Sequence, residues 1–130
     1  MIGIVIVAHG GLAQEYLAAL EHVVGKQSGV IAVAIEANHD RRAKQTEITL
    51  AAQKVDQGAG VVLVTDMFGG TPSNLSLLAC GSVDHKVVYG ANLPLLIKLV
   101  KCRNKPMDIA VSAALEAGRK YIDCCEGAPQ

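Results

Sequence analysis

Four runs of aliphatic residues alternate along the chain with segments in which apolar residues recur every three or four positions. The runs are continuous, as in parallel strands that are covered on both faces. They predict strands at Ile2 to Val7, Val30 to Ile35, Val61 to Val64 and Lys86 to Tyr89. The three- and four-residue spacing predicts helices, which lie at about residues 12–24, between 41 and 57, and at about 71–80, 93–104 and 107–117.

Small residues and prolines mark the ends of these helices. Gly25 and Gly58 end the first and the second helix. Thr71 is predicted to cap the third helix, with Pro72 as its first helical residue. After the last helix, Tyr121-Ile122 either begins a terminal strand or extends the helix.

The order of the elements predicts an α/β fold. Strands that alternate with helices form a doubly wound, mainly parallel sheet with helices on both faces. Right-handed crossovers and a two-faced cover favour winding outward from the first strand, which gives the strand order 2-1-3-4. Because no linker, repeat or low-complexity tract interrupts the pattern, we expect a single domain over residues 1–130.

Composition excludes several classes of partner. The 12 basic and 12 acidic residues cancel, so no broad positive field exists for nucleic acid or an anionic membrane. Aromatic residues make up only 3% of the chain, too few for a run of stacking platforms. Without a membrane-length apolar run, a signal peptide or a C-x-x-C spacing, the chain is expected to be cytoplasmic and its thiols reduced. The cysteines are Cys80, Cys102, Cys124 and Cys125.

The predicted topology indicates where a ligand should bind. In such sheets, ligands lie past the carboxyl ends of the strands at the switch point, here between the first and third strands. His9 follows the first strand, and an imidazole can carry a covalent phosphoryl group or act as acid or base. Asp66 follows the third strand and could accept one ring N–H, leaving the lone pair of the other nitrogen outward. A capping histidine and a turn aspartate are the ordinary alternatives.

The segment Gly69 to Asn74 joins the third strand to a helix N-terminus. Its amides and hydroxyls could surround phosphate oxygens at the positive end of that helix, although an ordinary capped helix is the alternative. Neither a P-loop nor a dinucleotide motif occurs. The other polar candidates are expected to be structural or solvated, with a docking patch as the alternative for the basic ones, and the histidines lack metal-ligand spacing. These other polar candidates are the histidines His22, His39 and His85 and the basic residues Arg41, Arg42 and Lys44.

Two motifs resemble a known family. Val7-Ala8-His9-Gly10 and Val64 to Asn74 are similar to the enzyme IIA domain of the mannose (mannose–fructose–sorbose) family of the bacterial phosphoenolpyruvate-dependent sugar phosphotransferase system. The similarity covers nearly the whole chain, including Gly90 to Pro94. The resemblance implies a phosphotransferase in which His9 accepts a phosphoryl group from an HPr-type phosphocarrier protein, with Asp66 orienting the ring. The implied phosphoryl-binding residues are Gly10, Phe68, Gly69, Gly70, Thr71 and Ser73.

The same resemblance implies partners and an assembly. His9 would pass the phosphoryl group to a IIB protein for sugar uptake; because no IIB domain is appended, a stand-alone regulatory IIA is also expected. The family is homodimeric, and Tyr121 to Cys124 matches the C-terminal strand that its subunits exchange. A histidine-to-histidine relay needs neither a metal nor another cofactor.

Other functions compete with this interpretation. A small tetrapyrrole metal chelatase also places His-Gly after its first strand, but the second histidine it usually needs is poorly matched by His85, which precedes the fourth strand. The phosphoryl-donor subunit of dihydroxyacetone kinase shares the fold. A receiver domain phosphorylated on Asp66 would need acidic residues where Ala8-His9-Gly10 stand. A non-catalytic binding module would carry no covalent phosphate.

Overall fold

The computed structural model of the chain contains one sheet of four parallel strands in the order β2-β1-β3-β4, which confirms the predicted order. It describes residues 1–67, 69–81 and 84–128, and only the main chain of Leu78. The strands are β1 (Gly3–His9), β2 (Val30–Ile35), β3 (Val61–Thr65) and β4 (His85–Tyr89). β1 pairs with both β2 and β3, so the strand that ends at His9 lies in the interior of the sheet.

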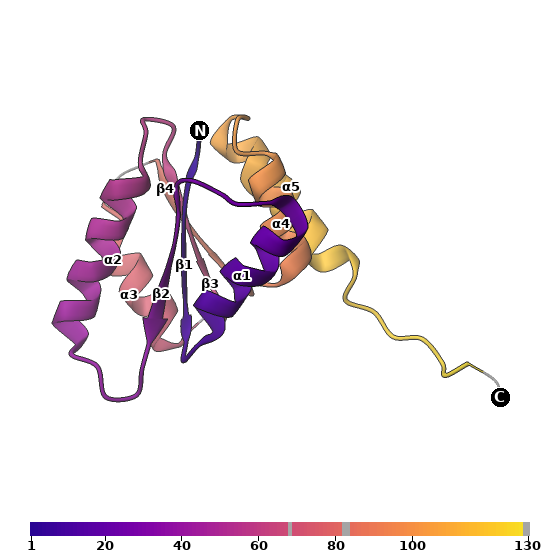
Figure 1. Cartoon of the computed structure of the whole chain (residues 1–130), viewed down its shortest axis with the longest axis horizontal. Helices are drawn as coiled ribbons and strands as arrows, with labels where there is room; N and C mark the ends of the chain where they lie inside the picture. Colours follow the sequence, from indigo (N-terminus) through magenta and orange to yellow (C-terminus); the bar gives the residue numbers. More distant parts are fainter. Residues whose placement is uncertain (68, 82–83, 129–130) are drawn as a thin grey trace.

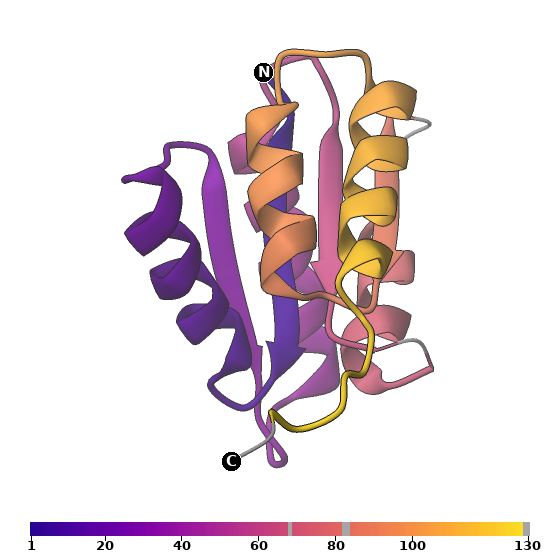
Figure 2. The ribbon, with the colours of Figure 1, turned by 90° about the vertical axis from the view of Figure 1, so that its right-hand side faces the viewer.

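Helices cover both faces of the sheet, as Figure 1 shows. One face carries α1 (Leu12–Val24), α4 (Leu93–Lys101) and α5 (Met107–Lys120). The other carries α2 (Arg41–Val55) and α3 (Thr71–Ala79). Figure 2 shows α1, α4 and α5 standing side by side in front of the strands. None of the helices among the described residues is long and apolar enough to cross a membrane.

The two cores explain why the strands contain continuous apolar runs. Ile4 and Ile6 point into the core beneath α1, α4 and α5, whereas Val5 and Val7 point into the core beneath α2 and α3. All four side chains are fully buried. Successive residues of a strand face opposite sides, so a sheet covered on both sides requires an apolar residue at every position of its inner strands.

Three helix ends differ from the prediction. α4 ends at Lys101, about three residues before its predicted end. Gly70, not Thr71, is the N-cap of α3, and Thr71 is already helical. The helix thus begins one residue early, and the hydroxyl that contacts the main chain before it belongs to Ser73 rather than to the predicted cap. At the other end of the chain, α5 continues to Lys120 and Tyr121 caps it, so the helix runs about three residues beyond its predicted end.

Residues 122–128 form neither a strand nor a helix. This tail is exposed throughout and leaves the body of the molecule after α5 (Figure 1). The single chain therefore has no strand in this tail, the helix extension stops before Ile122, and the exchange of a strand between subunits stays a prediction.

A buried arginine forms hydrogen bonds with the main chain at the amino ends of β1 and β2. Arg103, which is 3% exposed, follows α4. Its guanidinium donates to the main-chain oxygens of Ile2, Ser28 and Gly29 at 2.8, 2.7 and 3.0 Å. Burial lowers the pKa of this guanidinium from its ordinary value. The contacts join α4 to the starts of β1 and β2, at the sheet edge opposite His9.

Candidate functional site

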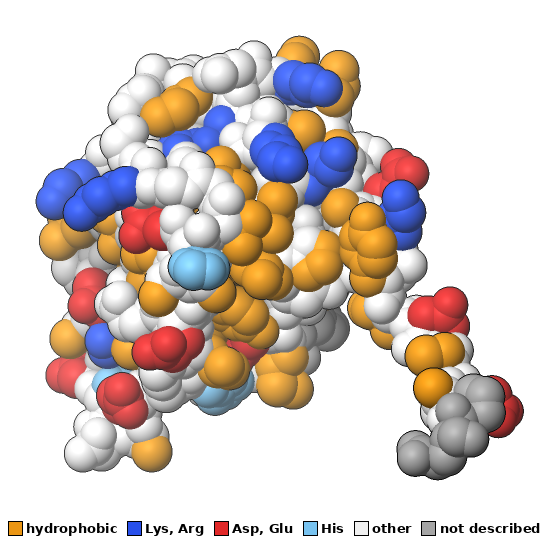
Figure 3. Space-filling view, turned by 45° about the vertical axis from the view of Figure 1, so that its right-hand side comes forward, with side chains coloured by type: hydrophobic (Ala, Val, Ile, Leu, Met, Phe, Trp, Pro, Cys, Tyr) orange, Lys and Arg blue, Asp and Glu red, His pale blue; other side chains and the backbone are white. Residues whose placement is uncertain are grey.

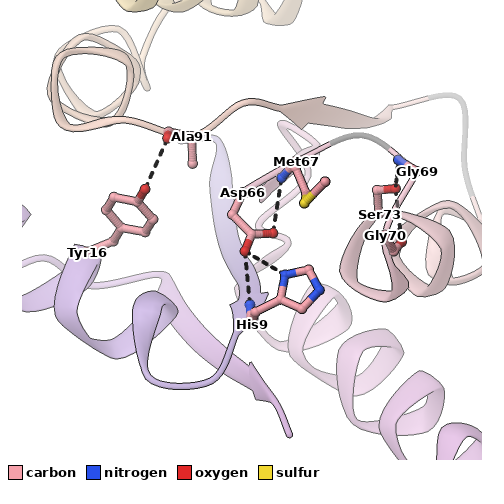
Figure 4. A network of polar contacts seen from close by, with 8 residues as sticks. All are labelled: His9, Tyr16, Asp66, Met67, Gly69, Gly70, Ser73 and Ala91. Atoms are coloured by element: carbon pink, nitrogen blue, oxygen red, sulfur yellow. Dashed lines mark hydrogen bonds and ion pairs between the residues drawn. The ribbon is translucent and has the colours of Figure 1, made fainter. Parts of the chain in front are cut away.

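His9 and Asp66 meet at the carboxyl ends of β1 and β3. These strands are neighbours, with Val7 in register with Thr65, so the residues that follow them lie together. His9 Nδ1 lies 2.8 Å from Asp66 Oδ2, and the main-chain N–H of His9 donates to the same oxygen at 3.1 Å. Asp66 Oδ1 accepts the N–H of Met67 at 3.0 Å (Figure 4). The carboxylate is thus held at both oxygens.

The surroundings of Asp66 favour its ionised form. Partial burial raises the pKa of this carboxyl, but the hydrogen bonds from the side chain and main chain of His9 outweigh it, and the net pKa lies below the ordinary value. An ionised carboxylate only accepts hydrogen bonds, so Nδ1 of His9 carries the proton. In the neutral ring, Nε2 then holds the lone pair. The His9 side chain is 47% exposed, so the ring is accessible to a second molecule.

Gly70 brings the N-terminus of α3 against the His9 ring. A Cβ on Gly70 would lie 3.1 Å from Cε1 and 3.5 Å from Nε2 of His9. Glycine is needed here for this close approach and not for its backbone, because its φ of −89° suits any residue. No side chain caps α3, so the positive end of the helix is open beside the ring.

Ser73 holds the loop that precedes α3. Its hydroxyl accepts the N–H of Gly69 at 2.9 Å and donates to the main-chain oxygen of Gly70 at 3.2 Å (Figure 4). Ser73 is fully buried. In this arrangement the hydroxyl supports the loop, and a direct contact between Ser73 and a phosphoryl group stays a prediction.

A cavity of about 400 Å³ opens next to the His9 ring. Its walls come from three parts of the chain: the end of β1, the start of α3 and the loop after β2. His9 is in register with Ile35, and the N–H of Gly10 donates to the oxygen of Ile35 at 2.9 Å, which holds the β2 end beside the ring. The lining residues are His9, Gly10, Ile35, Glu36, Ala37, His39 and Thr71.

The predicted site residues fall into three groups. His9, Gly10 and Thr71 line the cavity, and Asp66 holds His9. Gly69, Gly70 and Ser73 form the loop that leads into α3. Phe68 lies outside the described residues, so its predicted role is not addressed by the structure.

Sequence reasoning missed the contribution of the loop after β2. His39 was expected to be solvated, yet it lines the same cavity as His9. The strand order 2-1-3-4 contained the signal, because it puts the end of the second strand next to the end of the first. His85 lies at the other edge of the sheet, where β4 begins, with its Nε2 3.4 Å from Asp56 Oδ2.

The remaining candidates are away from the cavity. His22 is exposed on the last turn of α1, and Arg41 and Arg42 are exposed at the start of α2. Lys44 pairs with Glu47 at 2.8 Å. In the ranges 1–67, 69–81 and 84–128, no group of three or more His, Cys, Asp or Glu side chains is arranged to hold a metal ion.

Known proteins resemble this chain over most of its length. A family model for the PTS system fructose IIA component, EIIA-man, matches residues 3–116. The PTS system mannose-specific EIIAB component of Escherichia coli (strain K12) is 27% identical over 131 residues, covering 98% of this chain and 41% of that protein. The chain therefore spans about two fifths of the length of this curated relative. YadI of the same strain is 32% identical over 108 residues, covering 79% of this chain and 71% of YadI.

Solved structures agree with this relationship. The phosphotransferase system component EIIA of Streptococcus agalactiae superposes with a TM-score of 0.80 and 29% identity, covering 95% of this chain and 97% of that one. The mannose/sorbose-specific IIA subunit of Enterococcus faecalis has a TM-score of 0.86 and covers 99% of this chain and 98% of its own; at 21% identity this likeness concerns the fold. These matches confirm the resemblance predicted from the motifs, and the chain belongs to the EIIA-man family of phosphotransferase-system IIA components.

Proposed function

We propose that the protein is a phosphoryl carrier in which His9 Nε2 accepts a phosphoryl group from an HPr-type phosphohistidine protein and passes it to a IIB protein. One observation carries the proposal: Asp66 holds Nδ1 of His9 at 2.8 Å, while Nε2 lies against Gly70 at the N-terminus of α3. A phosphoryl group on Nε2 would therefore lie at the positive end of a helix, which supports this role.

The geometry supports transfer without a covalent role for any other side chain. The lone pair of Nε2 attacks phosphorus, and the phosphorus–nitrogen bond of the donor breaks, leaving its electron pair on the donor ring. The proton on Nδ1 stays in place, so the phosphorylated ring is positively charged. The Asp66 carboxylate, already ionised by its hydrogen bonds, stabilises that charge.

The start of α3 would contact the incoming phosphoryl oxygens. Thr71 lines the cavity, and the first amides of α3 have no side-chain cap to satisfy them. Gly10, with a φ of 54°, turns the chain sharply after His9 and has no atom within 4 Å of the place of a Cβ. Both features leave room for a phosphoryl group and its donor close to the ring.

Apolar side chains around the site suit protein partners. Three exposed apolar residues lie near the carboxyl ends of the strands: Leu12 begins α1, Met67 follows β3, and Tyr89 ends β4. Their exposed fractions are 45%, 54% and 50%. Exposed apolar residues that cluster around a reactive group are typical of docking surfaces. We infer that phosphoryl donor and acceptor proteins dock over this rim.

We also propose a homodimer formed through the tail. β4 is an edge strand of the sheet, and its outer side offers main-chain hydrogen bonds to another strand. Tyr121 and Ile122, at the beginning of the tail, are 67% and 75% exposed. Figure 3 shows hydrophobic side chains gathered in a band on the side of the molecule that faces the tail. A tail exchanged between two copies would cover apolar surface that the single chain leaves open.

The pathway beyond His9 is either sugar uptake, through a IIB protein, or regulation by a stand-alone IIA. The chain covers the IIA-sized part of relatives named mannose-specific EIIAB components, and sugar uptake follows from that relationship. A chelatase and a dihydroxyacetone-kinase subunit are not proposed, because the family match is to IIA components and His85 lies at the opposite sheet edge. A cytoplasmic location stays a prediction.

Phosphorylation in vitro tests the carrier function. The protein is incubated with radiolabelled phosphoenolpyruvate, enzyme I and an HPr-type protein, and acid-labile label on the chain is measured over time. Wild type should be labelled at one site, and His9→Ala should not be labelled. Asp66→Asn should slow labelling at least about 10²-fold, because an amide does not fix the reactive tautomer.

The control for this experiment is His22→Ala, which removes an exposed histidine on the last turn of α1. Its labelling rate should equal that of wild type. Label that persists in His9→Ala, or a wild type that takes up no label, would contradict the proposed function.

A further inference from the structure

The cavity beside His9 holds a second imidazole. His39 comes from the loop after β2, is partly buried and lines this cavity together with His9 and Thr71. The strand order β2-β1-β3 brings the loop there, and the hydrogen bond from Gly10 to Ile35 closes it against the end of β1. A side chain at position 39 is thus presented to the same space that a phosphoryl group on His9 would enter.

Main-chain contacts determine which nitrogen of His39 is available. Nδ1 contacts the main-chain oxygen of Glu36, and the N–H of His39 donates to the same oxygen at 3.4 Å. A carbonyl oxygen only accepts hydrogen bonds, so Nδ1 carries a proton. Within the described part of the chain, the side-chain hydrogen bonds of both His9 and His39 are made through Nδ1. In both rings, Nε2 is therefore the nitrogen left to contact a group in the cavity.

We propose that His39 is a second phosphoryl-binding residue, whose Nε2 contacts the phosphoryl group carried by His9. This inference rests on the proposed phosphorylation of His9. When the phosphoryl group arrives, His39 takes up one proton from solvent at Nε2 and donates it in a hydrogen bond to a phosphoryl oxygen. No bond to phosphorus forms or breaks at His39, which acts on the stability of the phosphorylated state.

The negative charges around His39 make a positively charged hydrogen-bond donor favourable in this cavity. Glu36 lines the same cavity, and Asp66 is ionised behind the His9 ring. Both carboxylates repel a phosphoryl group, which brings a charge of about −1.5 to −2. Asp40, the next residue, is engaged with the first amides of α2, and Arg41 and Arg42 are exposed at the start of that helix. A protonated His39 therefore supplies positive charge inside the cavity itself.

The transfer equilibrium measures this contribution. Wild type, His39→Ala, His39→Lys and the control His22→Ala are each mixed with phosphorylated HPr-type protein, and the phosphorylated fraction of both proteins is measured at equilibrium. His39→Ala should shift the equilibrium about tenfold toward the donor, the effect of losing one hydrogen bond to a charged group. His39→Lys keeps a cationic donor and should recover most of that shift. His22→Ala should equal wild type.

Nitrogen NMR of the histidine rings gives a readout that a structural role would not change. Phosphorylation of His9 should change the resonance of His39 Nε2 to that of a nitrogen that donates a hydrogen bond.

The results separate this inference from the function on which it rests. A wild type that is not phosphorylated on His9 contradicts the carrier function itself. Normal phosphorylation of His9, with His39→Ala and His22→Ala giving the same equilibrium, overturns the role of His39 alone. Label that persists in His9→Ala but disappears in His9→Ala/His39→Ala would identify His39 as an acceptor and also overturn the inference.

Discussion

At the scale of single residues, the site depends on the absence of a side chain at Gly70 as well as on the imidazole of His9. The His9 ring lies close to Gly70, with Cε1 3.1 Å from where a Cβ would be, and this contact brings Nε2 to the start of α3. Asp66 fixes the opposite side of the ring through Nδ1. The imidazole is therefore located from two sides before any partner binds, which is the arrangement that positioning catalysis requires.

Gly70→Ala should disturb transfer much more than folding. The added Cβ would lie 3.1 Å from His9 Cε1, so the ring must shift by a few tenths of an ångström and Nε2 becomes covered. We expect the rate of phosphoryl acceptance to fall about tenfold or more, whereas the loss of stability stays near 1 kcal/mol, the usual cost of alanine at an N-cap. Rapid-quench labelling and urea denaturation measure the two effects.

Gly11→Ala is the matched control for this prediction. Gly11 is the N-cap of α1, also lacks a side-chain cap bond, and has no atom within 4 Å of the place of a Cβ. Gly11→Ala should lower the free energy of unfolding about as much as Gly70→Ala does. It should have only a small effect on the rate of phosphoryl acceptance. Equal acceptance rates in the two variants would mean that contact with the ring is not what Gly70 provides.

At the scale of elements, strand ends and helix starts build the site together. β1 and β3 bring His9 and Asp66, α3 brings its open N-terminus, and the loop from β2 to α2 brings His39. That loop is short because α2 begins at Arg41, immediately after Asp40. Its geometry therefore depends on how firmly α2 starts.

Asp40 fixes the start of α2. Its Oδ1 accepts the N–H groups of Arg42 and Ala43 at 2.9 and 3.2 Å, and its charge opposes that of two arginines at the positive helix end. Asp40→Ala should lower the free energy of unfolding by about 1 kcal/mol, whereas Asp40→Asn, which keeps the cap, should lower it by less than about 0.5 kcal/mol. Urea denaturation tests this; equal losses in both variants would assign the effect to charge instead of to the cap.

The sequence patterns were sufficient for the strands and for the pairing of His9 with Asp66. Inner strands of a two-faced parallel sheet are apolar at every position, so β1 and β3 stand out, and the winding rule places their carboxyl ends together. His39 was missed because a histidine in a polar loop carries no apolar periodicity, and only the cavity shows what it faces. The cap at Gly70 was missed because glycine has no side-chain signal, and the neighbouring threonine is the more common cap.

At the scale of the whole molecule, the candidate site and the contacts of Arg103 lie at opposite ends of the strands. The site occupies the carboxyl ends of the strands, while Arg103 joins the amino ends through three main-chain oxygens. The tail leaves from the end of α5 and contributes no residue that lines the described cavity at His9. The tail of a single chain is therefore not part of that chain's own candidate site.

Ile122→Asp should prevent the proposed dimer from forming without unfolding the chain. The side chain is 75% exposed in the single chain, so a charge there costs little unless a second copy buries it. In sedimentation velocity at about 50 μM, wild type should run as a dimer and Ile122→Asp as a monomer with an unchanged circular-dichroism spectrum.

Leu50→Asp is the control, because Leu50 is 58% exposed on α2, which covers the opposite face of the sheet. It should remain dimeric. A monomeric wild type, or the same state for both variants, would remove the tail from the proposed assembly.

The interior position of β1 has a consequence for the direction of phosphoryl flow. His9 ends a strand that is hydrogen-bonded on both sides, and its own N–H and Nδ1 are held by Asp66. If His9 carries the phosphoryl group as proposed, loading and unloading would use the same nitrogen in the same position, without a prior rearrangement of the ring. Which way phosphate moves would be decided by the relative amounts of phosphorylated donor and empty acceptor in the cell, and this chain would report that ratio through the occupancy of a single nitrogen.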